Sequence, residues 1–324
     1  MGGGGTGLGA EETFQYIGEE TQSAPVGIQD GLPEGGEIQQ SGTVFRLMLS
    51  VFVENKAAVF AVGFLIFMIG FCWIGPLLYH SNQTNAAAAG NFVNLPPQKG
   101  FPLGTDSAGF DILGRLMYGG QISMEVGFAA ALLSSLVGTT WGVIAGFFSG
   151  ATDSVMMRIV DVMLSIPALY LLIAVSTIVP KTATMYILIL GLLSWLVASR
   201  LMRGETLTLK TRDFVQAVRS MGGTRKRMMF RHIVPNSVGT IAVYTTFAVS
   251  DNIIALASLS FIGLGVQSPQ TDWGGMLYTG SQYIFDGYWW QVFPVCIVLT
   301  AVVMSVNFIG DAMRDAFEVR LQRR

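Results

Sequence analysis

Six stretches of apolar residues follow one another along the chain, separated by polar segments. A helix needs about twenty mostly apolar residues to cross a bilayer. The stretches comprise residues 57–79, 122–148, 162–179, 185–201, 238–266 and 292–312. This pattern predicts an all-α membrane protein with six transmembrane helices.

Two of these spans contain a residue that is unusual in a membrane helix. Pro167 lies in the third span, where neighbouring helices can satisfy the carbonyl that a proline leaves free. Asp251 lies within the fifth span, and charged groups at such depth are costly and often functional. Asp251 either lines a translocation path or hydrogen-bonds with a neighbouring helix, and the sequence leaves both roles open.

The composition agrees with a lipid environment. Hydrophobic residues make up 51% of the chain and charged residues 12%, whereas soluble domains average about 25% charged residues. Seven acidic residues precede the first base, Arg46: Glu11, Glu12, Glu19, Glu20, Asp30, Glu34 and Glu37. We expect residues 1–42 to form a disordered, acidic and Gly-rich cytosolic tail, and residues 43–324 to form the membrane domain.

The distribution of positive charge predicts the orientation. Cytosolic segments of membrane proteins carry an excess of Lys and Arg. With a cytosolic N-terminus, sixteen of the nineteen bases fall in cytosolic segments, and the outer loops carry only Lys99, Arg115 and Lys181. We therefore expect both termini to be cytoplasmic.

The segment between the fourth and fifth spans is basic and polar. Residues 200–236 hold nine bases: Arg200, Arg203, Lys210, Arg212, Arg219, Arg225, Lys226, Arg227 and Arg231. Phe214, Val218 and Met221 recur at a spacing that places them on one face of a helix. Gly222 and Gly223 follow, and we expect them to end this helix.

A second short helix is predicted over residues 225–232. Thr224 can cap its start, and it must end before Pro235. The segment can serve as a surface for lipid headgroups or as a docking element for a cytosolic partner. Nucleic-acid binding is disfavoured because no aromatic residues alternate with the bases.

Two local ion pairs are expected from helical spacing. Arg158 and Asp161 lie three residues apart. Residues 102–118 predict an amphipathic helix at the outer surface, capped by Thr105 or Asp106, in which Asp111 and Arg115 pair four residues apart.

The sequence contains no arrangement of residues typical of an enzyme. It lacks the G-x-x-x-x-G-K-[ST] nucleotide-binding motif. His80 and His232 are the only histidines and fall on opposite sides of the predicted membrane domain, while Cys72 and Cys296 lie inside apolar runs. We expect no catalytic residues, no cofactor and no metal site.

The basic segment resembles the EAA loop of ABC-transporter permeases. Gln216, Ala217 and Val218 occupy the Glu-Ala-Ala positions, Gly222 matches the glycine of that pattern, and Val234–Pro235 match its hydrophobic-Pro ending. Gln replaces Glu and Val replaces the second Ala, so a contact through that carboxylate is not available here. The helix–Gly–helix–Pro frame is unaffected.

Further segments are similar to the oligopeptide/dipeptide/nickel permease family, C-type subunit. They are PLGTDSAGFDILGRLMYG at 102–119, MMRIVDVMLSIPALYLLIA at 156–174 and LSFIGLGVQSPQTDWGGML at 259–277. The resemblance implies the permease fold of a type I ABC importer in a bacterial cell membrane. It also implies a coupling loop at about 203–236.

This resemblance implies the following roles and partners. Coupling to the ATPases would use Phe214, Gln216, Ala217, Val218, Met221, Gly222, Gly223 and Pro235, and the translocation path would pass near Pro167 and Asp251. Partners would be a second permease subunit in a heterodimer, two cytosolic ATP-binding subunits, an extracytoplasmic substrate-binding protein, a peptide substrate and membrane lipid. The alternative is an ion-gradient-driven secondary transporter or channel, which would need an intramembrane ionisable relay or paired discontinuous repeats.

Overall fold

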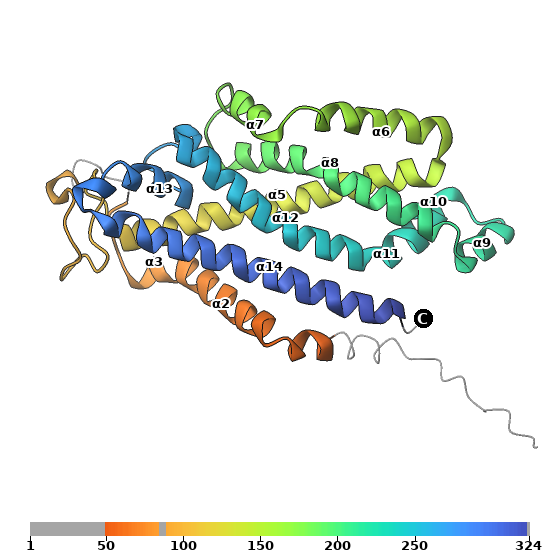
Figure 1. The fold of residues 1–324 in the computed structure, drawn as a ribbon, viewed down its shortest axis with the longest axis horizontal. Coiled ribbons are helices and arrows are strands. Elements are labelled where there is room, and N and C mark those ends of the chain that lie inside the picture. The colour runs from red at the N-terminus through yellow and green to blue at the C-terminus, as the bar shows by residue number, and fades with distance from the viewer. Residues whose placement is uncertain (1–48, 84–88, 323–324) are drawn as a thin grey trace, which may run out of the picture. The chain divides into compact units, whose positions relative to one another are not determined.

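The computed structural model describes residues 49–83 and 89–322, and these belong to one compact unit (Figure 1). The predicted disordered tail, residues 1–42, lies outside the described residues. The described part is helical, and its only β-structure is two isolated bridges, Gln98 to Phe101 and Thr105 to Asp111.

The helices follow the predicted apolar stretches with different ends. The α-helices are α2 (Lys56–Trp73), α3 (Gly75–Leu78), α5 (Ile112–Phe148), α6 (Gly150–Leu164), α7 (Ala168–Ser176), α8 (Ala183–Leu209), α9 (Asp213–Ser220), α10 (Arg225–Arg227), α11 (Val234–Asn236), α12 (Val238–Leu259), α13 (Trp273–Ser281) and α14 (Phe293–Gln322). Two π-helical turns, η2 (Met228–Ile233) and η3 (Ser260–Leu264), and three short 3₁₀ turns, η1 (Gly90–Phe92), η4 (Ile284–Asp286) and η5 (Trp289–Gln291), join them.

Five helices among the described residues are individually long and apolar enough to span a membrane, and one bent pair of helices passes the same test when its two members are taken together. The pair consists of α6 and α7, which meet at an angle of 75°. Pro167 lies at the break as the residue before α7, where its missing N–H and fixed φ do not interrupt a helix. The all-α membrane fold is thus confirmed, with five continuous candidate spans and a sixth if the bent pair crosses as one.

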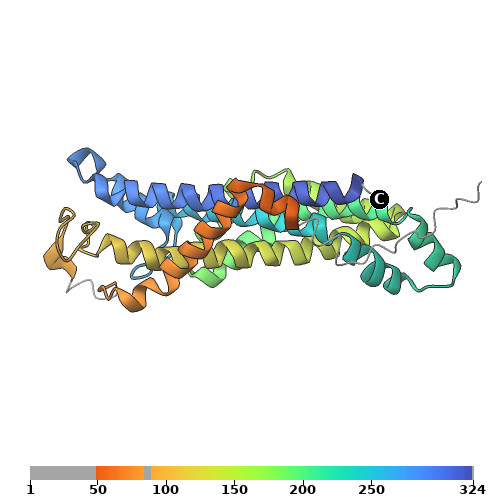
Figure 2. The same cartoon turned by 90° about the horizontal axis from the view of Figure 1, so that it is seen from below.

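The helix α5 begins ten residues before the predicted start of its span. Asp111 caps it, and its carboxylate accepts hydrogen bonds from the N–H groups of Leu113 (3.4 Å) and Gly114 (3.1 Å). The cap satisfies donors that the first helical turn cannot pair internally. Helix α5 packs against α2, α8 and α12 and therefore lies at the centre of the bundle (Figures 1 and 2).

Helices α5 and α8 approach each other closely because three glycines line one face of α5. Gly138, Gly142 and Gly146 are spaced four residues apart. A Cβ atom on these glycines would lie 2.8, 2.4 and 2.8 Å from the backbone oxygens of Trp195, Ser199 and Arg203, respectively. Small residues at such spacing allow membrane helices to pack backbone to backbone.

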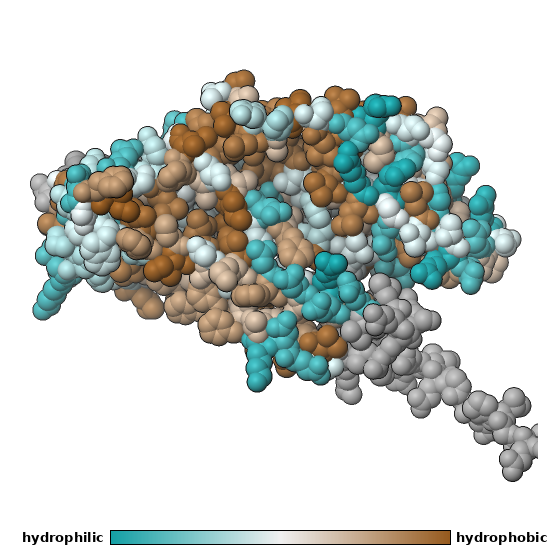
Figure 3. All heavy atoms as spheres, viewed as in Figure 1, coloured by the Kyte–Doolittle hydropathy of each residue, from teal (hydrophilic) through white to brown (hydrophobic). Residues whose placement is uncertain are grey.

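In Figure 3 hydrophobic residues predominate over the upper left and upper middle of the face shown, whereas polar residues are frequent at the end where α9 lies and across the lower middle. Large apolar side chains such as Phe60 (76% exposed) and Ile178 (84% exposed) lie on the surface of the described unit. This distribution is the one expected for helices whose solvent is lipid.

Candidate functional site

The helix α9 lies at one end of the bundle, here called the α9 end, and packs against η2. Val215 is 2% exposed and, together with Val218, contacts a cluster that includes Met228 and Ile233. Gly222 and Gly223 end the helix as predicted: their N–H groups donate to the carbonyls of Arg219 (3.0 Å) and Val218 (2.9 Å).

Gly222 adopts φ +77°, which only glycine reaches without strain. The two backbone bonds and this left-handed residue form a Schellman motif. The turn therefore fixes the direction in which the chain leaves α9 and approaches η2.

The three residues predicted to share one face of this helix, Phe214, Val218 and Met221, differ in exposure. Phe214 is 40% exposed and Met221 is 78% exposed, whereas Val218 is partly buried. The face that packs is defined by Val215 and Val218, because only that side of α9 meets η2. Phe214 and Met221 are left on the surface.

The remaining candidate coupling residues are also accessible. Gln216 donates from Nε2 to the carbonyl of Lys210 (3.1 Å) and is exposed, as is Ala217 beside it. Gln216 thus braces α9 against the end of α8.

The helix predicted to end before Pro235 does not end there. Thr224 caps its start as predicted, accepting from the N–H of Arg227 at 3.3 Å. The chain then continues through α10, η2 and α11 towards α12, with Pro235 in the first turn of α11. A proline in the first turn of a helix removes no intrahelical hydrogen bond. The wider π-turn of η2 precedes Pro235, so the helical path continues through the proline.

A groove of about 510 Å³ lies beside α9 at the same end of the bundle. Its lining includes Phe148, Lys210, Gln216, Arg219 and Arg225. The Lys210 ammonium group donates to the carbonyl of Gly146 (2.9 Å) and contacts the hydroxyl of Ser149. The Arg225 guanidinium lies 5.6 Å from the centre of the Phe148 ring. The surface therefore combines positive charge with exposed apolar side chains.

Two ion pairs join α6 to α8. Arg203 donates through Nε and Nη2 to the two carboxylate oxygens of Asp153, both at 2.6 Å. Asp161 pairs with Arg200 at 2.5 Å. The expected pair of Asp161 with Arg158 is not formed, because α6 turns Asp161 towards α8 and a guanidinium on that helix reaches it.

We expect Asp153→Asn to lower the free energy of unfolding by about 1–2 kcal/mol, because it leaves the partly buried Arg203 without its bidentate partner. Asp161→Asn is the matched control. Both partners of its pair have side chains about half exposed, and such pairs contribute about 0–1 kcal/mol. Unfolding of the purified protein in detergent measures both effects, and equal losses in the two variants would contradict the expectation.

Asp251 and the break at Pro167 lie around one cavity of about 270 Å³. Its lining includes Asp251, Asn252 and the two neighbours of Pro167, Ile166 and Ala168. Residues from α6, α7, α8 and α12 complete it. The sequence identified Asp251 but not Asn252, whose partner Ser194 is 58 residues away along the chain.

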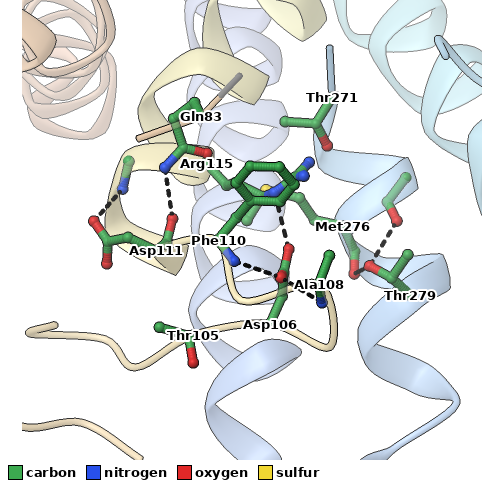
Figure 4. Close-up of polar contacts among 12 residues, drawn as sticks. Gln83, Thr105, Asp106, Ala108, Phe110, Asp111, Arg115, Thr271, Met276 and Thr279 are labelled. Carbon is green, nitrogen blue, oxygen red and sulfur yellow. Dashed lines mark hydrogen bonds and ion pairs between the residues drawn. The ribbon is translucent and has the colours of Figure 1, made fainter. Parts of the chain in front are cut away.

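The opposite end of the bundle, here called the α13 end, is held by polar contacts around Asp106 (Figure 4). The Asp106 carboxylate accepts from the N–H groups of Ala108 (2.9 Å) and Phe110 (2.8 Å) and pairs with Arg115 at 2.9 Å. The predicted Asp111–Arg115 pair is wrong, because Asp111 is occupied as the cap of α5. Residues 102–110 accordingly form a loop rather than the start of the predicted helix.

Two carboxyl groups at the α13 end are strongly buried. Burial raises the pKa of Asp106, and the Arg115 guanidinium opposes part of that rise. Burial likewise raises the pKa of Asp272, which caps α13 by accepting from the N–H of Gly275 (3.1 Å) and also accepts from the hydroxyl of Ser260 (2.9 Å). Both carboxylates accept hydrogen bonds from nearby backbone N–H groups and so stabilise loops at this end.

Comparison with known proteins identifies the family. Residues 138–323 match the family described as binding-protein-dependent transport system inner membrane component. Residues 43–97 match the N-terminal transmembrane domain of oligopeptide transport permease C.

Similar proteins match most of the chain. The chain is 36% identical to the oligopeptide transport system permease protein OppC of Haemophilus influenzae over 272 residues, which is 82% of this chain and 86% of that protein. It is 33% identical to the dipeptide transport system permease protein DppC of Bacillus subtilis, over 83% of this chain and 84% of that protein. The chain therefore belongs to the family of binding-protein-dependent transport system inner membrane components, and it is a non-catalytic, multi-pass permease of an ABC transport system.

Proposed function

We propose that this permease forms half of the translocation path of an ATP-driven peptide importer and couples to cytosolic ATPases through residues 203–236. The α9 end carries the proposal. Phe214 and Met221 are exposed there, beside a groove that contains Lys210, Arg219 and Arg225. Exposed apolar side chains and basic residues at the same end of the bundle suit docking of a folded partner, since interfaces combine apolar and polar groups.

Backbone and side-chain contacts link this surface to the membrane helices. The buried residues Val215 and Val218 of α9 pack on η2, and η2 continues through α11 towards α12. A partner that moves α9 would therefore also move α12. Gly222 and Gly223 fix the turn between α9 and η2, and Pro235 lies at the start of α11, so both positions belong to this linkage.

Gln216 and Ala217 belong to the accessible side of the proposed docking surface. Because Gln216 carries no charge, binding of the ATPase would rely on apolar contacts of Phe214 and Met221. The arginines and lysines at the same end of the bundle would orient the partner and accelerate its association.

The translocation path would pass along the cavity near Pro167 and Asp251. Helix α12 carries Asp251 and lies at the far end of the linkage from α9. Movement of α12 against the α6–α7 break would change the shape of this cavity. Coupling and translocation would thus share one helix.

The family supports the remaining assignments. The names of the similar proteins from Haemophilus influenzae and Bacillus subtilis specify oligopeptides and dipeptides, which favours a peptide substrate. The partners would be a second permease in a heterodimer, two cytosolic ATP-binding subunits and an extracytoplasmic substrate-binding protein. The excess of Lys and Arg at the α9 end favours a cytoplasmic location for that end and for both termini.

Co-purification and transport test this proposal. The tagged permease should bring down a second permease and an ATPase, and the complex in lipid vesicles should take up peptide only with ATP and the binding protein. Uptake driven by an ion gradient without ATP, or purification without an ATPase, would refute it.

A further inference from the structure

Asp251 lies at the middle of a candidate membrane span. The span runs from Val238 to Leu264, and Asp251 is thirteen residues from each end. At about 1.5 Å of rise per residue, the residue lies roughly 20 Å along the helix from either end. A charged group at that depth is costly, and such groups face a partner or a water-filled cavity rather than lipid.

The Asp251 carboxyl group has no partner within the described part of the chain. The residue is exposed, and it forms neither a hydrogen bond through its side chain nor an ion pair with any described residue. Its polar neighbours bond to one another instead. The Ser194 hydroxyl donates to Oδ1 of Asn252 at 2.9 Å, and the Tyr244 hydroxyl donates to the backbone carbonyl of Ser194 at 2.8 Å. The carboxyl group is therefore left free.

The cavity at the α6–α7 break places apolar side chains beside this group. Leucines and alanines on α6, α7, α8 and α12 form most of its lining. None of the described residues that line it carries a positive charge. Ligand sites typically combine such apolar walls with a few polar groups that fix orientation. Asp251 is therefore placed to bind a cation that enters the cavity from outside the chain.

We propose, on the basis of the proposed function, that the Asp251 carboxylate forms an ion pair with the N-terminal ammonium group of the translocating peptide. The first side chain of that peptide would lie against the apolar wall. The cavity of about 270 Å³ is smaller than the roughly 300–1,000 Å³ typical of sites that enclose a small ligand. It therefore receives the N-terminal residue rather than the whole peptide.

Recognition of an ammonium group has a consequence for specificity. Every linear peptide with a free N-terminus carries this charge, whatever its side chains, so one carboxylate serves many sequences. A peptide whose N-terminus is acetylated cannot form the pair. A path must also bind its substrate strongly enough to admit it and weakly enough to release it, which favours a single ion pair over a site that encloses the peptide.

Variants of Asp251 test the role of its charge in the complete transporter, reconstituted in phosphatidylcholine vesicles with its ATPases and binding protein. Asp251→Asn keeps the size of the side chain and removes the charge. Uptake of radiolabelled trialanine should fall about tenfold, which corresponds to an interaction worth about 1.4 kcal/mol. Asp251→Glu keeps the charge and should retain more uptake than Asp251→Asn.

Glu125→Gln is the matched control. Glu125 is also exposed on a membrane helix, α5, and also lacks an ion pair within the described part of the chain, but it does not line the cavity. Its replacement should leave uptake within twofold of the wild type. Equal losses in Glu125→Gln and Asp251→Asn would show that uptake depends on charge in the spans generally, and would overturn a specific role of the cavity.

Coupling by a carbodiimide identifies the amine that the carboxylate meets. Dicyclohexylcarbodiimide is apolar and activates carboxyl groups, and an amine in contact with the activated group then forms an amide bond and releases the urea. During ATP turnover with trialanine amide, whose C-terminus cannot be activated, mass spectrometry should find the peptide attached to Asp251. N-acetyl-trialanine amide should give no such adduct. Phosphatidylcholine has no primary amine, so the lipid cannot supply the coupled group.

The outcomes distinguish this inference from the proposed function. ATP-driven uptake of trialanine by the wild type, with undiminished uptake by Asp251→Asn or with no peptide attached to Asp251, would overturn the role of Asp251 alone. No ATP-driven peptide uptake by the wild type would overturn the proposed function. Attachment of Asp251 to a lysine of the second permease, in place of the peptide, would show that the carboxylate binds a subunit and would also overturn the inference.

Discussion

Gly142→Leu is expected to abolish accumulation of the folded permease in the membrane. A Cβ atom at position 142 would lie 2.4 Å from the backbone oxygen of Ser199 and 2.8 Å from the backbone nitrogen of Arg203. These are backbone atoms of α8 and cannot move aside as the end of a flexible side chain can. Inserting extra carbons into a well-packed core costs about 1–3 kcal/mol even where side chains can adjust, so a leucine here should force α5 and α8 apart.

The amount of monodisperse protein after detergent extraction measures this effect. Gly63→Leu on α2 is the matched control, because a Cβ atom there meets nothing within 4 Å. That variant should accumulate normally. If Gly142→Leu yields as much folded protein as Gly63→Leu, the backbone-to-backbone packing of α5 on α8 does not limit folding.

The positions of the spans could be predicted from the sequence because a bilayer imposes a simple rule on helix length and polarity. Gly222 also behaves as its local chemistry predicts, because it lies in a left-handed turn. Pro167 was expected within one continuous span, but it lies at a break between α6 and α7, where its fixed φ sets the local backbone. Such residues act through their own backbone dihedral angles. Their effects therefore do not depend on knowing which helices are neighbours.

The choice of ion-pair partners could not be predicted from helical spacing. Asp161 and Arg158 are close along one helix, yet Asp161 binds Arg200 on α8. Arg115 likewise binds Asp106 rather than Asp111. In both cases a competing partner is supplied by the fold, either as a nearby guanidinium or as a helix end that occupies the carboxylate.

The packed face of α9 was also hidden from the sequence. Phe214 and Met221 have the periodicity of buried residues, but only one side of this short helix contacts the rest of the protein. Val215 and Val218 occupy that side. Apolar residues left exposed on a short helix are consistent with a surface that a partner subunit covers.

The contacts that run from α9 to α12 would let the proposed docking surface act on the distant cavity near Asp251. Helix α9 packs on η2, and η2 leads through α11 towards α12, which carries both Asp251 and Asn252. Nucleotide-driven movement at the proposed docking surface would reach the cavity through helices rather than through flexible loops. The turn at Gly222 then becomes the position at which the linkage is easiest to break without disturbing the membrane spans.

Gly222→Pro is expected to reduce ATP-driven peptide uptake more than tenfold while the permease still inserts and ATP hydrolysis continues. Proline is fixed near φ −65°, far from the +77° of Gly222, and it lacks the N–H that donates to Arg219. The turn must therefore change, and α9 loses its direction relative to η2. Folding of the spans should survive, because a Cβ atom at position 222 would meet nothing within 4 Å.

Gly287→Pro is the matched control for this change. Gly287 also has a positive φ, +90°, its N–H donates to Ile284 at 3.2 Å, and its surroundings are equally open, but it lies at the α13 end. Uptake by this variant should remain within twofold of the wild type. Gly222→Ala should have an intermediate effect, since a left-handed conformation costs an alanine about 1–2 kcal/mol. Transport and ATPase rates measured on the same vesicles decide the matter: full uptake by Gly222→Pro would show that the turn after α9 does not transmit force to the membrane helices.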